Sequence, residues 1–238
     1  MKIALLGYGK MGREIEKIAI ERGHEIVATI DKDNYDDIQS EAFRSAQAVI
    51  EFSTPETAFD NIISCLSLGI PVVSGTTGWL NRFDEAKKIC DEKQGAFFYA
   101  SNYSLGVNIF FHINRELARI MDKFTDYNVG MEEIHHTQKK DAPSGTAITL
   151  ANDIVKQIAR KSKWVDGDEA NDNEVGIKSI REGNVPGTHT VTYNSDVDTI
   201  TITHEAKSRK GFALGAVIAA EFIAGKKGIY TMSDVLGV

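Results

Sequence analysis

Residues 2–12 read Lys-Ile-Ala-Leu-Leu-Gly-Tyr-Gly-Lys-Met-Gly, and this stretch decides the fold of the N-terminal half. The apolar run is typical of a buried parallel strand, and its glycines follow at once in G-x-G-x-x-G spacing. The next residues place Ile15, Ile18 and Ala19 on one helical face, and a second apolar run ends at Asp31. Strand, glycine turn, helix, strand and a closing acid predict a Rossmann-type dinucleotide-binding unit.

Each part of this fingerprint has a physical role. The first glycine permits the tight turn, the second lets the backbone approach a pyrophosphate, and the third lets the helix pack close to the strand. The helix N-terminus favours diphosphate charge, and Asp31 can accept hydrogen bonds from the adenosine ribose. Asp31 would repel a 2′-phosphate, whereas Lys32 can pair with one, so we expect NADH, with NADPH as an alternative. The cofactor contacts predicted here are Gly7, Tyr8, Gly9, Lys10, Met11, Gly12, Asp31 and Lys32.

Further strands and helices extend this half. Apolar runs over residues 48–53, 70–74 and 95–99 predict the third, fourth and fifth strands of a doubly wound parallel sheet. Ser53-Thr-Pro-Glu56 has the spacing of a helix capping box. Residues 32–47 are interpreted as a short linker.

The pattern changes after Ser104. A helix with a broad apolar face is predicted over residues 107–121, and residues 162–174, which are polar and acidic, are interpreted as a mobile surface loop. Three alternating runs within residues 176–204 predict an open antiparallel sheet covered on one face. A final apolar helix begins at Gly211.

The segment with the most chemistry lies between these parts. Residues 133–146 read Glu-Ile-His-His-Thr-Gln-Lys-Lys-Asp-Ala-Pro-Ser-Gly-Thr, after a predicted strand over 127–134 and before a predicted helix. Lys139 is a cation with three donors, and the imidazole of His135 can donate or accept a proton. Proton donors at a strand end, followed by free N–H groups at a helix start, make a site for an anionic substrate.

This segment resembles the signature Glu-x-His-His-x-x-Lys-x-Asp-Ala-Pro-Ser-Gly-Thr-Ala of the 4-hydroxy-tetrahydrodipicolinate (dihydrodipicolinate) reductase family. The resemblance implies NAD(P)H-dependent reduction of 4-hydroxy-tetrahydrodipicolinate to tetrahydrodipicolinate, with loss of water, in lysine and diaminopimelate biosynthesis. It implies that His135 and Lys139 handle protons and that His136 binds substrate; a structural histidine tying strand to loop is the other interpretation of His136. Gly145 and Thr146 offer N–H groups for a carboxylate, and Ser144 can also cap the helix. The predicted substrate-binding residues are therefore His136, Ser144, Gly145 and Thr146.

The resemblance also implies the domain organisation. The last helix returns to the nucleotide-binding part, so residues 1–104 and 209–238 form a dinucleotide-binding domain, and residues 105–208 an inserted α+β domain that binds substrate and builds a homotetramer. Its sheet is expected to be open, mixed or antiparallel. In a later segment similar to the family's, Thr188 replaces the usual Glu. By resemblance, the residues that line the nicotinamide and its ribose are Gly75, Thr76, Thr77, Ala100, Ser101, Asn102 and Tyr103, and Arg209 either contacts cofactor or forms a structural ion pair.

Composition narrows the class further. Hydrophobic residues make up 42% and charged residues 26% of the chain, as in globular proteins, and the formal net charge of −7 argues against nucleic acid as a partner. No apolar run approaches the ~20 residues of a membrane helix, and the N-terminus shows no signal-peptide pattern. Cys65 and Cys90 match no metal spacing, so buried thiols in the cytoplasm and no metal are expected.

Two other functions fit part of this pattern. The glycine fingerprint also fits another NAD(P)-dependent oxidoreductase that acts on a small amino or keto acid, because fold does not fix function. A dinucleotide-sensing regulator without turnover would have lost its proton donors, yet His135 and Lys139 are both present. The combined histidine, lysine and Pro-Ser-Gly-Thr pattern favours the reductase.

Overall fold

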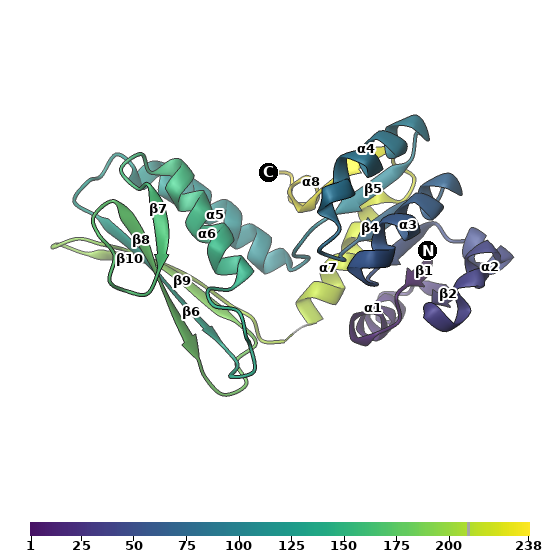
Figure 1. Cartoon of the computed structure of the whole chain (residues 1–238), viewed down its shortest axis with the longest axis horizontal. Helices are drawn as coiled ribbons and strands as arrows, with labels where there is room; N and C mark the ends of the chain where they lie inside the picture. Colours follow the sequence, from purple (N-terminus) through teal and green to yellow (C-terminus); the bar gives the residue numbers. More distant parts are fainter. Residues whose placement is uncertain (209) are drawn as a thin grey trace. The chain divides into compact units, whose positions relative to one another are not determined.

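The computed structural model describes residues 1–208 and 210–238, which divide into two compact units (Figure 1). The first unit comprises Met1–Leu105 and Lys210–Val238, and the second comprises Gly106–Arg209. Arg209, one of the predicted cofactor contacts, lies outside the described residues. No helix in the described part of the chain is long and apolar enough to cross a membrane.

A six-stranded sheet with every neighbouring pair parallel forms the centre of the first unit. Its order places the second strand at one edge and a sixth strand near the C-terminus at the other. The five expected strands are confirmed, and the sixth was not anticipated. In sheet order they are β11 (Gly228–Tyr230), β5 (Ala96–Tyr99), β4 (Val72–Ser74), β3 (Ala48–Glu51), β1 (Lys2–Leu6) and β2 (Glu25–Ile30).

Helices cover both faces of this sheet, as expected for a doubly wound α/β fold. Helices α1 (Lys10–Glu21) and α7 (Lys210–Ile223) form one core with β1, β3, β4 and β5, and α3 (Pro55–Ser67) and α4 (Phe83–Glu92) form the other. The predicted inner face of α1 is buried, and each large aliphatic side chain buried in such a core stabilises it by about 1.5–3 kcal/mol. A short helix, α8 (Met232–Leu236), ends the chain.

Two expectations for this unit were wrong. The supposed linker contains a 3₁₀ helix, η1 (Lys32–Gln39), and a short helix, α2 (Glu41–Arg44), because Ile38 and Phe43 bury their side chains in the core. The capping box at Ser53 is absent, since Thr54 is the N-cap residue of α3 and its side chain makes no cap hydrogen bond.

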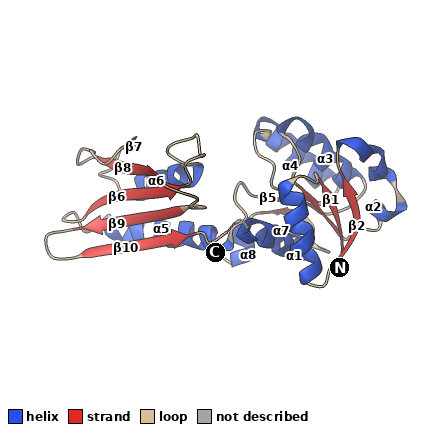
Figure 2. Ribbon diagram, turned by 90° about the horizontal axis from the view of Figure 1, so that it is seen from below, coloured by secondary structure: helices blue, strands red, loops and turns tan. Residues whose placement is uncertain are grey.

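The second unit contains a five-stranded sheet, whose strands lie side by side in Figure 2. The outer part pairs antiparallel as expected, but β6 with β8 and β7 with β8 pair parallel, so the sheet is mixed. The predicted loop 162–174 was wrong in part, because β7 lies within it. In sheet order the strands are β10 (Thr199–Glu205), β9 (Thr188–Asn194), β6 (Asn128–His135), β8 (Glu174–Arg181) and β7 (Lys163–Asp166).

Helices α5 (Leu105–Met121) and α6 (Gly145–Gln157) lie on one face of this sheet (Figure 1). The odd-numbered residues of β6 from Val129 to His135 are buried and the even-numbered residues are not, which is the two-residue period of a sheet covered on one side. This alternation turns the side chains of Glu133 and His135 to the same, covered face.

Candidate active site

The glycine turn after β1 has the geometry that its sequence predicts. Gly7 has φ +88°, and a Cβ there would lie 2.0 Å from the carbonyl oxygen of Phe52. A Cβ on Gly12 would lie 2.3 Å from the oxygen of Gly7. At Gly9, by contrast, a Cβ would meet no atom within 4 Å, and no side chain caps the helix that begins there. The backbone thus leaves open space before the N-terminus of α1, where an anion is favoured.

Asp31 lies exposed at the end of β2 and caps η1. Its Oδ1 accepts the N–H of Lys32 at 2.9 Å, while its own N–H donates to Oδ1 of Asn34 at 2.8 Å. One carboxylate oxygen is thus held by the protein. The strand end therefore presents a fixed negative charge beside the exposed Lys32.

A buried carboxyl group organises the neighbouring strand ends. Oε1 of Glu51, at the end of β3, accepts the N–H of Ser53 at 3.0 Å and the hydroxyl of Thr76 at 2.9 Å. Its Oε2 accepts the hydroxyl of Ser74 at 2.6 Å, and the Ser53 hydroxyl donates to Oε1. The turn from Gly75 onward, predicted to line the nicotinamide, is therefore tied to β3.

The second predicted turn, residues 100–103, is only partly open. Tyr103 is 2% exposed, packs against Phe52 and Phe98, and donates its hydroxyl to the carbonyl of Ser74 at 2.6 Å. Its side chain therefore supports the strand ends from the core, and the contact with the cofactor predicted for this residue stays a prediction. Ser101 is exposed, and Ala100 and Asn102 are half-buried.

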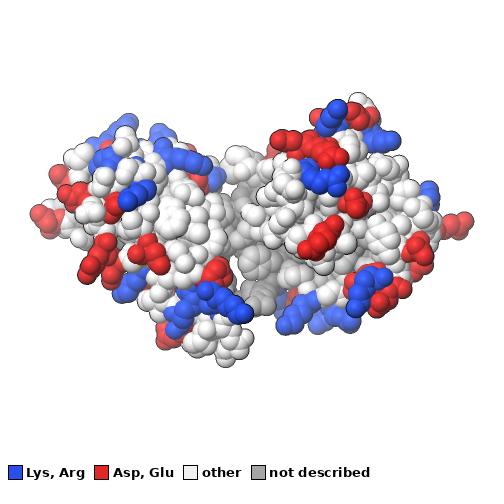
Figure 3. Space-filling view, viewed as in Figure 1, with Lys and Arg blue, Asp and Glu red and all other residues white. Residues whose placement is uncertain are grey.

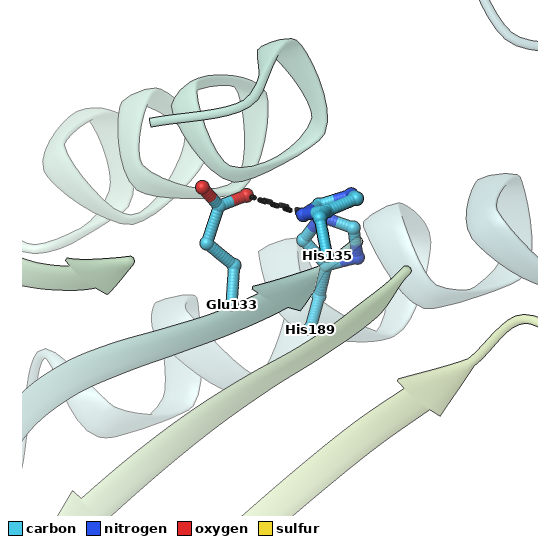
Figure 4. A group of neighbouring side chains, drawn as sticks. All are labelled: Glu133, His135 and His189. Carbon is cyan, nitrogen blue, oxygen red and sulfur yellow. Dashed lines mark ion pairs between the residues drawn. The ribbon is translucent and has the colours of Figure 1, made fainter. Parts of the chain in front are cut away.

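In the second unit, the end of β6 meets the start of β9. His135 is 7% exposed, Glu133 is fully buried, and strand register places Glu133 directly beside His189. Figure 4 shows the three side chains converging from the two strands. His135 Nδ1 lies 3.3 Å, and His189 Nε2 lies 3.7 Å, from the same oxygen, Oε2 of Glu133.

The other oxygen of Glu133 carries three hydrogen bonds. It accepts from the Ser144 N–H at 3.0 Å, the Ser179 hydroxyl at 2.9 Å and Nη2 of Arg181 at 3.1 Å. Burial acts to raise the pKa of Glu133, but the nearby imidazole of His135 and the hydrogen bonds from Ser144 and Ser179 outweigh it and hold that pKa well below its usual range. Glu133 is therefore a carboxylate at neutral pH.

His189 is the neutral member of this cluster. Burial, followed by repulsion from His135, lowers the pKa of His189 to about 4, although Glu133 acts in the opposite direction. Its Nε2 also lies 3.1 Å from the hydroxyl of Ser144.

The start of α6 follows the sequence prediction closely. Ser144 is the N-cap residue, and its hydroxyl accepts the N–H of Ala147 at 3.2 Å. Gly145 is exposed, a Cβ there would meet nothing within 4 Å, and Thr146 is half-buried. Open space therefore lies at the first turn of a 13-residue helix.

The loop between β6 and α6 carries Lys139. Its ammonium group lies 2.9 Å from both carboxylate oxygens of Asp141, and this hydrogen bond lowers the pKa of Asp141. Arg181 donates from Nη2 to the backbone oxygen of Asp141 at 2.6 Å. His136, half-buried, donates its backbone N–H to Val185 at 2.8 Å, which ties the loop to the residues before β9.

The sequence-based prediction assigned no role to Glu133, Arg181 or His189. In the structure, these three side chains link the ends of neighbouring strands at the site. One signal was available, since Glu133 and His135 are two residues apart on a predicted strand and so share a face. Their convergence with Arg181 and His189 depends on strand register, which the sequence does not display.

The donor atoms of Glu133, His135 and His189 all lie within 4.8 Å of one another, a spacing that can suit a metal ion. Protein groups already hydrogen-bond Oε1 of Glu133 and Nε2 of His189, whereas Oε2 of Glu133 and Nδ1 of His135 make no hydrogen bond within the described residues. The Arg181 guanidinium supplies positive charge at the carboxylate, and Ser144 lies beside His189. We therefore interpret the cluster as a network of charged and polar protein groups centred on the Glu133–Arg181 pair.

Fold and site together fit one class of protein: an oxidoreductase with a Rossmann-type parallel sheet in one unit and, in the other, a mixed sheet in which the Glu133 and His135 pair precedes the open start of α6. Family models agree with this class over nearly the whole chain. "Dihydrodipicolinate reductase, N-terminus" matches residues 1–103, and "Dihydrodipicolinate reductase, C-terminus" matches residues 106–236. The chain belongs to the dihydrodipicolinate reductase family and is an NAD(P)H-dependent oxidoreductase of lysine biosynthesis.

Individual relatives agree. The 4-hydroxy-tetrahydrodipicolinate reductase of Christiangramia forsetii is 54% identical, covering 99% of this chain and 98% of its own. That of Caldanaerobacter subterraneus subsp. tengcongensis is 36% identical, covering 96% and 94%. Among solved structures, the dipicolinate-bound dihydrodipicolinate reductase from Paenisporosarcina sp. TG-14 shares the fold with a TM-score of 0.77, at 22% identity and 97% coverage of both chains.

Proposed function

We propose that this chain reduces 4-hydroxy-tetrahydrodipicolinate to tetrahydrodipicolinate with loss of water, and that the second unit binds this dicarboxylate between the end of β6 and the start of α6. One observation carries the proposal: the buried Glu133–His135 pair, 3.3 Å apart, immediately precedes the Lys139 loop and an open helix N-terminus. Proton donors and an anion site thus lie on one continuous segment. The first unit then serves as the dinucleotide-binding domain.

The residues of the first unit fit a dinucleotide. The open space at Gly9 and the uncapped start of α1 suit a pyrophosphate, and the carboxylate of Asp31 suits ribose hydroxyls. The exposed Thr77 and Ser101 remain available on the nicotinamide side. When bound, the reduced cofactor supplies the hydride.

The residues of the second unit bind the substrate carboxylates and transfer protons. The N–H groups of Gly145 and Thr146 bind one substrate carboxylate at the helix start. Lys139 binds or protonates the substrate, and because it already pairs with the Asp141 carboxylate at 2.9 Å, an incoming anionic substrate competes with Asp141 for it. His135 donates or accepts a proton, and His136 assists substrate binding. Acidic and basic side chains are interspersed on the visible face (Figure 3), so the local cation Lys139 matters for a dianion.

The open face of the second unit's sheet is proposed to build a homotetramer. Threonines of β9 and β10 line it in register, with the hydroxyl oxygens of Thr190 and Thr203 3.2 Å apart. Light scattering after size exclusion is expected to give four times the 26.2 kDa chain mass, and Thr201→Lys, on the same face, is expected to lower it. A monomer at all concentrations would contradict this. Both cysteines are free thiols, which suits the proposed cytoplasmic location.

The test of function is substrate-dependent oxidation of NADH or NADPH, with the substrate made in situ by a purified synthase from pyruvate and aspartate semialdehyde. Wild type is expected to turn over, and His135→Ala and Lys139→Ala to lose about 100-fold or more in kcat. Lys140→Ala, which removes the adjacent exposed lysine, is the matched control. A folded wild-type protein that binds cofactor but leaves this substrate unreduced would point to a different amino or keto acid.

A further inference from the structure

We propose that Glu133 is the positioning residue of this active site: one buried carboxylate fixes the imidazole of His135, the first turn of α6 and the loop that carries Lys139. This inference rests on the proposed function and adds a residue to which neither proton transfer nor substrate binding has been assigned. Glu133 is 0% exposed, so it acts only through the groups that it touches.

The first contact orients His135. A neutral imidazole has one donor and one acceptor nitrogen, and a carboxylate beside Nδ1 selects the form protonated there. Nε2 is then the nitrogen that exchanges a proton with substrate. Gly187 keeps space beside it, because a Cβ on Gly187 would lie 3.0 Å from Nε2 of His135.

The second contact fixes the start of α6. Oε1 of Glu133 accepts the N–H of Ser144, while the Ser144 hydroxyl accepts that of Ala147. Two N–H groups of the helix start are thereby used by the protein. The N–H groups between them, those of Gly145 and Thr146, remain at the open first turn for the substrate carboxylate.

The third contact reaches Lys139 through Arg181. The Nη2 atom of Arg181 bridges Oε1 of Glu133 at 3.1 Å and the backbone oxygen of Asp141 at 2.6 Å. The Asp141 side chain in turn holds Lys139. Removing the carboxylate would release Arg181 and, with it, the anchor of the loop.

Charged and titratable groups from several elements surround the carboxylate of Glu133. The charged or titratable groups that face it are His135 on β6, Arg181 on β8 and His189 on β9, and His204 on β10 and Lys139 in the loop add to the field at His189. Arg181 balances the negative charge of Glu133. His135 is the group left to exchange protons.

The decisive variant is Glu133→Gln. Glutamine keeps an acceptor for the Ser144, Ser179 and Arg181 donors but turns an amide NH₂ toward Nδ1 of His135, which selects the opposite imidazole form. We expect kcat to fall between about 100-fold and 10,000-fold, with the KM for NADH unchanged. Glu133→Asp, which keeps the charge but withdraws it from the imidazole, is expected to lose kcat as well. Glu116→Gln, an exposed glutamate on α5, is the control and keeps wild-type kinetics.

A double-variant cycle separates positioning from a general structural role. If Glu133 acts through His135, the kcat of Glu133→Gln/His135→Ala equals that of His135→Ala alone. Multiplying losses in kcat, or wild-type kcat in a folded Glu133→Gln or Glu133→Asp protein, would overturn the proposal. Loss of activity on dialysis against EDTA with recovery on adding Zn²⁺ would also overturn it, because Glu133 would then be a metal ligand. Wild-type turnover of the dicarboxylate tests the proposed function separately.

Discussion

Each unit buries one glutamate completely near the carboxyl end of a central strand, but the two carboxyl groups are surrounded differently. Glu51 on β3 receives one backbone N–H and three hydroxyl groups, and no Lys, Arg or His of the described residues lies within 4.0 Å of it to form an ion pair. Glu133 on β6 receives a guanidinium and faces two imidazoles. Both groups join neighbouring strand ends into one site.

The difference follows from what each site must do. Neutral donors fix geometry around Glu51 without adding a proton carrier, which suits a unit whose proposed ligand brings its own hydride. Around Glu133 the charges are coupled to the proton carrier His135, which suits the unit proposed to exchange protons. Burying an unpaired carboxylate costs several kcal/mol, so Glu133 depends on Arg181 more than Glu51 depends on any single donor.

Removing that cation should give the largest effect. Arg181→Met leaves Glu133 buried without its guanidinium, and we expect a loss of about 3–5 kcal/mol in the free energy of unfolding, seen as a lowered Tm. Adding Glu133→Gln to the same chain should restore part of the loss, because no charge is then left uncompensated. Thermal unfolding of the three proteins measures this; equal Tm values for wild type and Arg181→Met would show that the pair is not coupled.

The second-largest effect is expected from acid, because protonation of His189 destabilises the second unit. Its pKa is lowered from 6.5 to about 4 by burial, so below pH 6.5 the unfolded chain takes up a proton that the folded chain refuses until about pH 4. Stability therefore falls as the pH falls through this window, by up to roughly 3 kcal/mol. His189→Gln should flatten the decline in denaturant titrations between pH 7 and about 4, and an unaltered slope would contradict the assignment. Glu133 acts at lower pH. Because its pKa is lowered in the folded chain, its carboxylate stabilises the fold at pH values above the usual pKa of Glu, and this stabilisation is lost as the pH falls further.

Glu51→Gln should have a smaller and more local effect. The hydroxyls of Ser53, Ser74 and Thr76 can rotate to accept from the new amide, whereas the Ser53 N–H still needs the remaining oxygen. We expect a cost of about 1–2 kcal/mol in stability and a several-fold higher KM for NADH, with the KM for the dicarboxylate unchanged. Asp60→Asn, on the exposed side of α3, is the control. A rise in the dicarboxylate KM alone would refute the division of labour between the two glutamates.

Prediction from sequence succeeded where one local stretch determines the structure. Gly7 has a positive φ and Gly12 packs closely against the backbone of Gly7, so the spacing of the glycines was sufficient to predict the turn after β1. The strands β7 and β11 were missed because neither contains a fully buried residue, unlike the equally short β3 and β4, and β11 pairs with β5, which is far away in the sequence. η1 was missed because only Ile38 marks its buried side.

The site divides in the same way. His135, Lys139 and the Ser144 cap lie on one segment, so their proximity was expected from the chain alone. Arg181 and His189 reach Glu133 only because β8 and β9 flank β6 in a particular register. The contact of Tyr103 with the cofactor stays a prediction, and the sequence gives no sign that its side chain packs into the core.

The smallest predicted effect concerns a third acid, the exposed Asp31. Because it is solvated, its charge acts weakly on a ligand compared with the two buried glutamates. Asp31→Asn keeps the capping oxygen that accepts from Lys32 but removes the charge, so η1 should remain folded. We expect the ratio of kcat/KM for NADPH over NADH to rise by up to about tenfold, or about 1.4 kcal/mol, because a 2′-phosphate is no longer repelled while Lys32 can still pair with it. Measured under equal salt, an unchanged ratio would exclude the ribose-binding role of Asp31, and a raised ratio with unchanged Tm would assign cofactor choice to its charge.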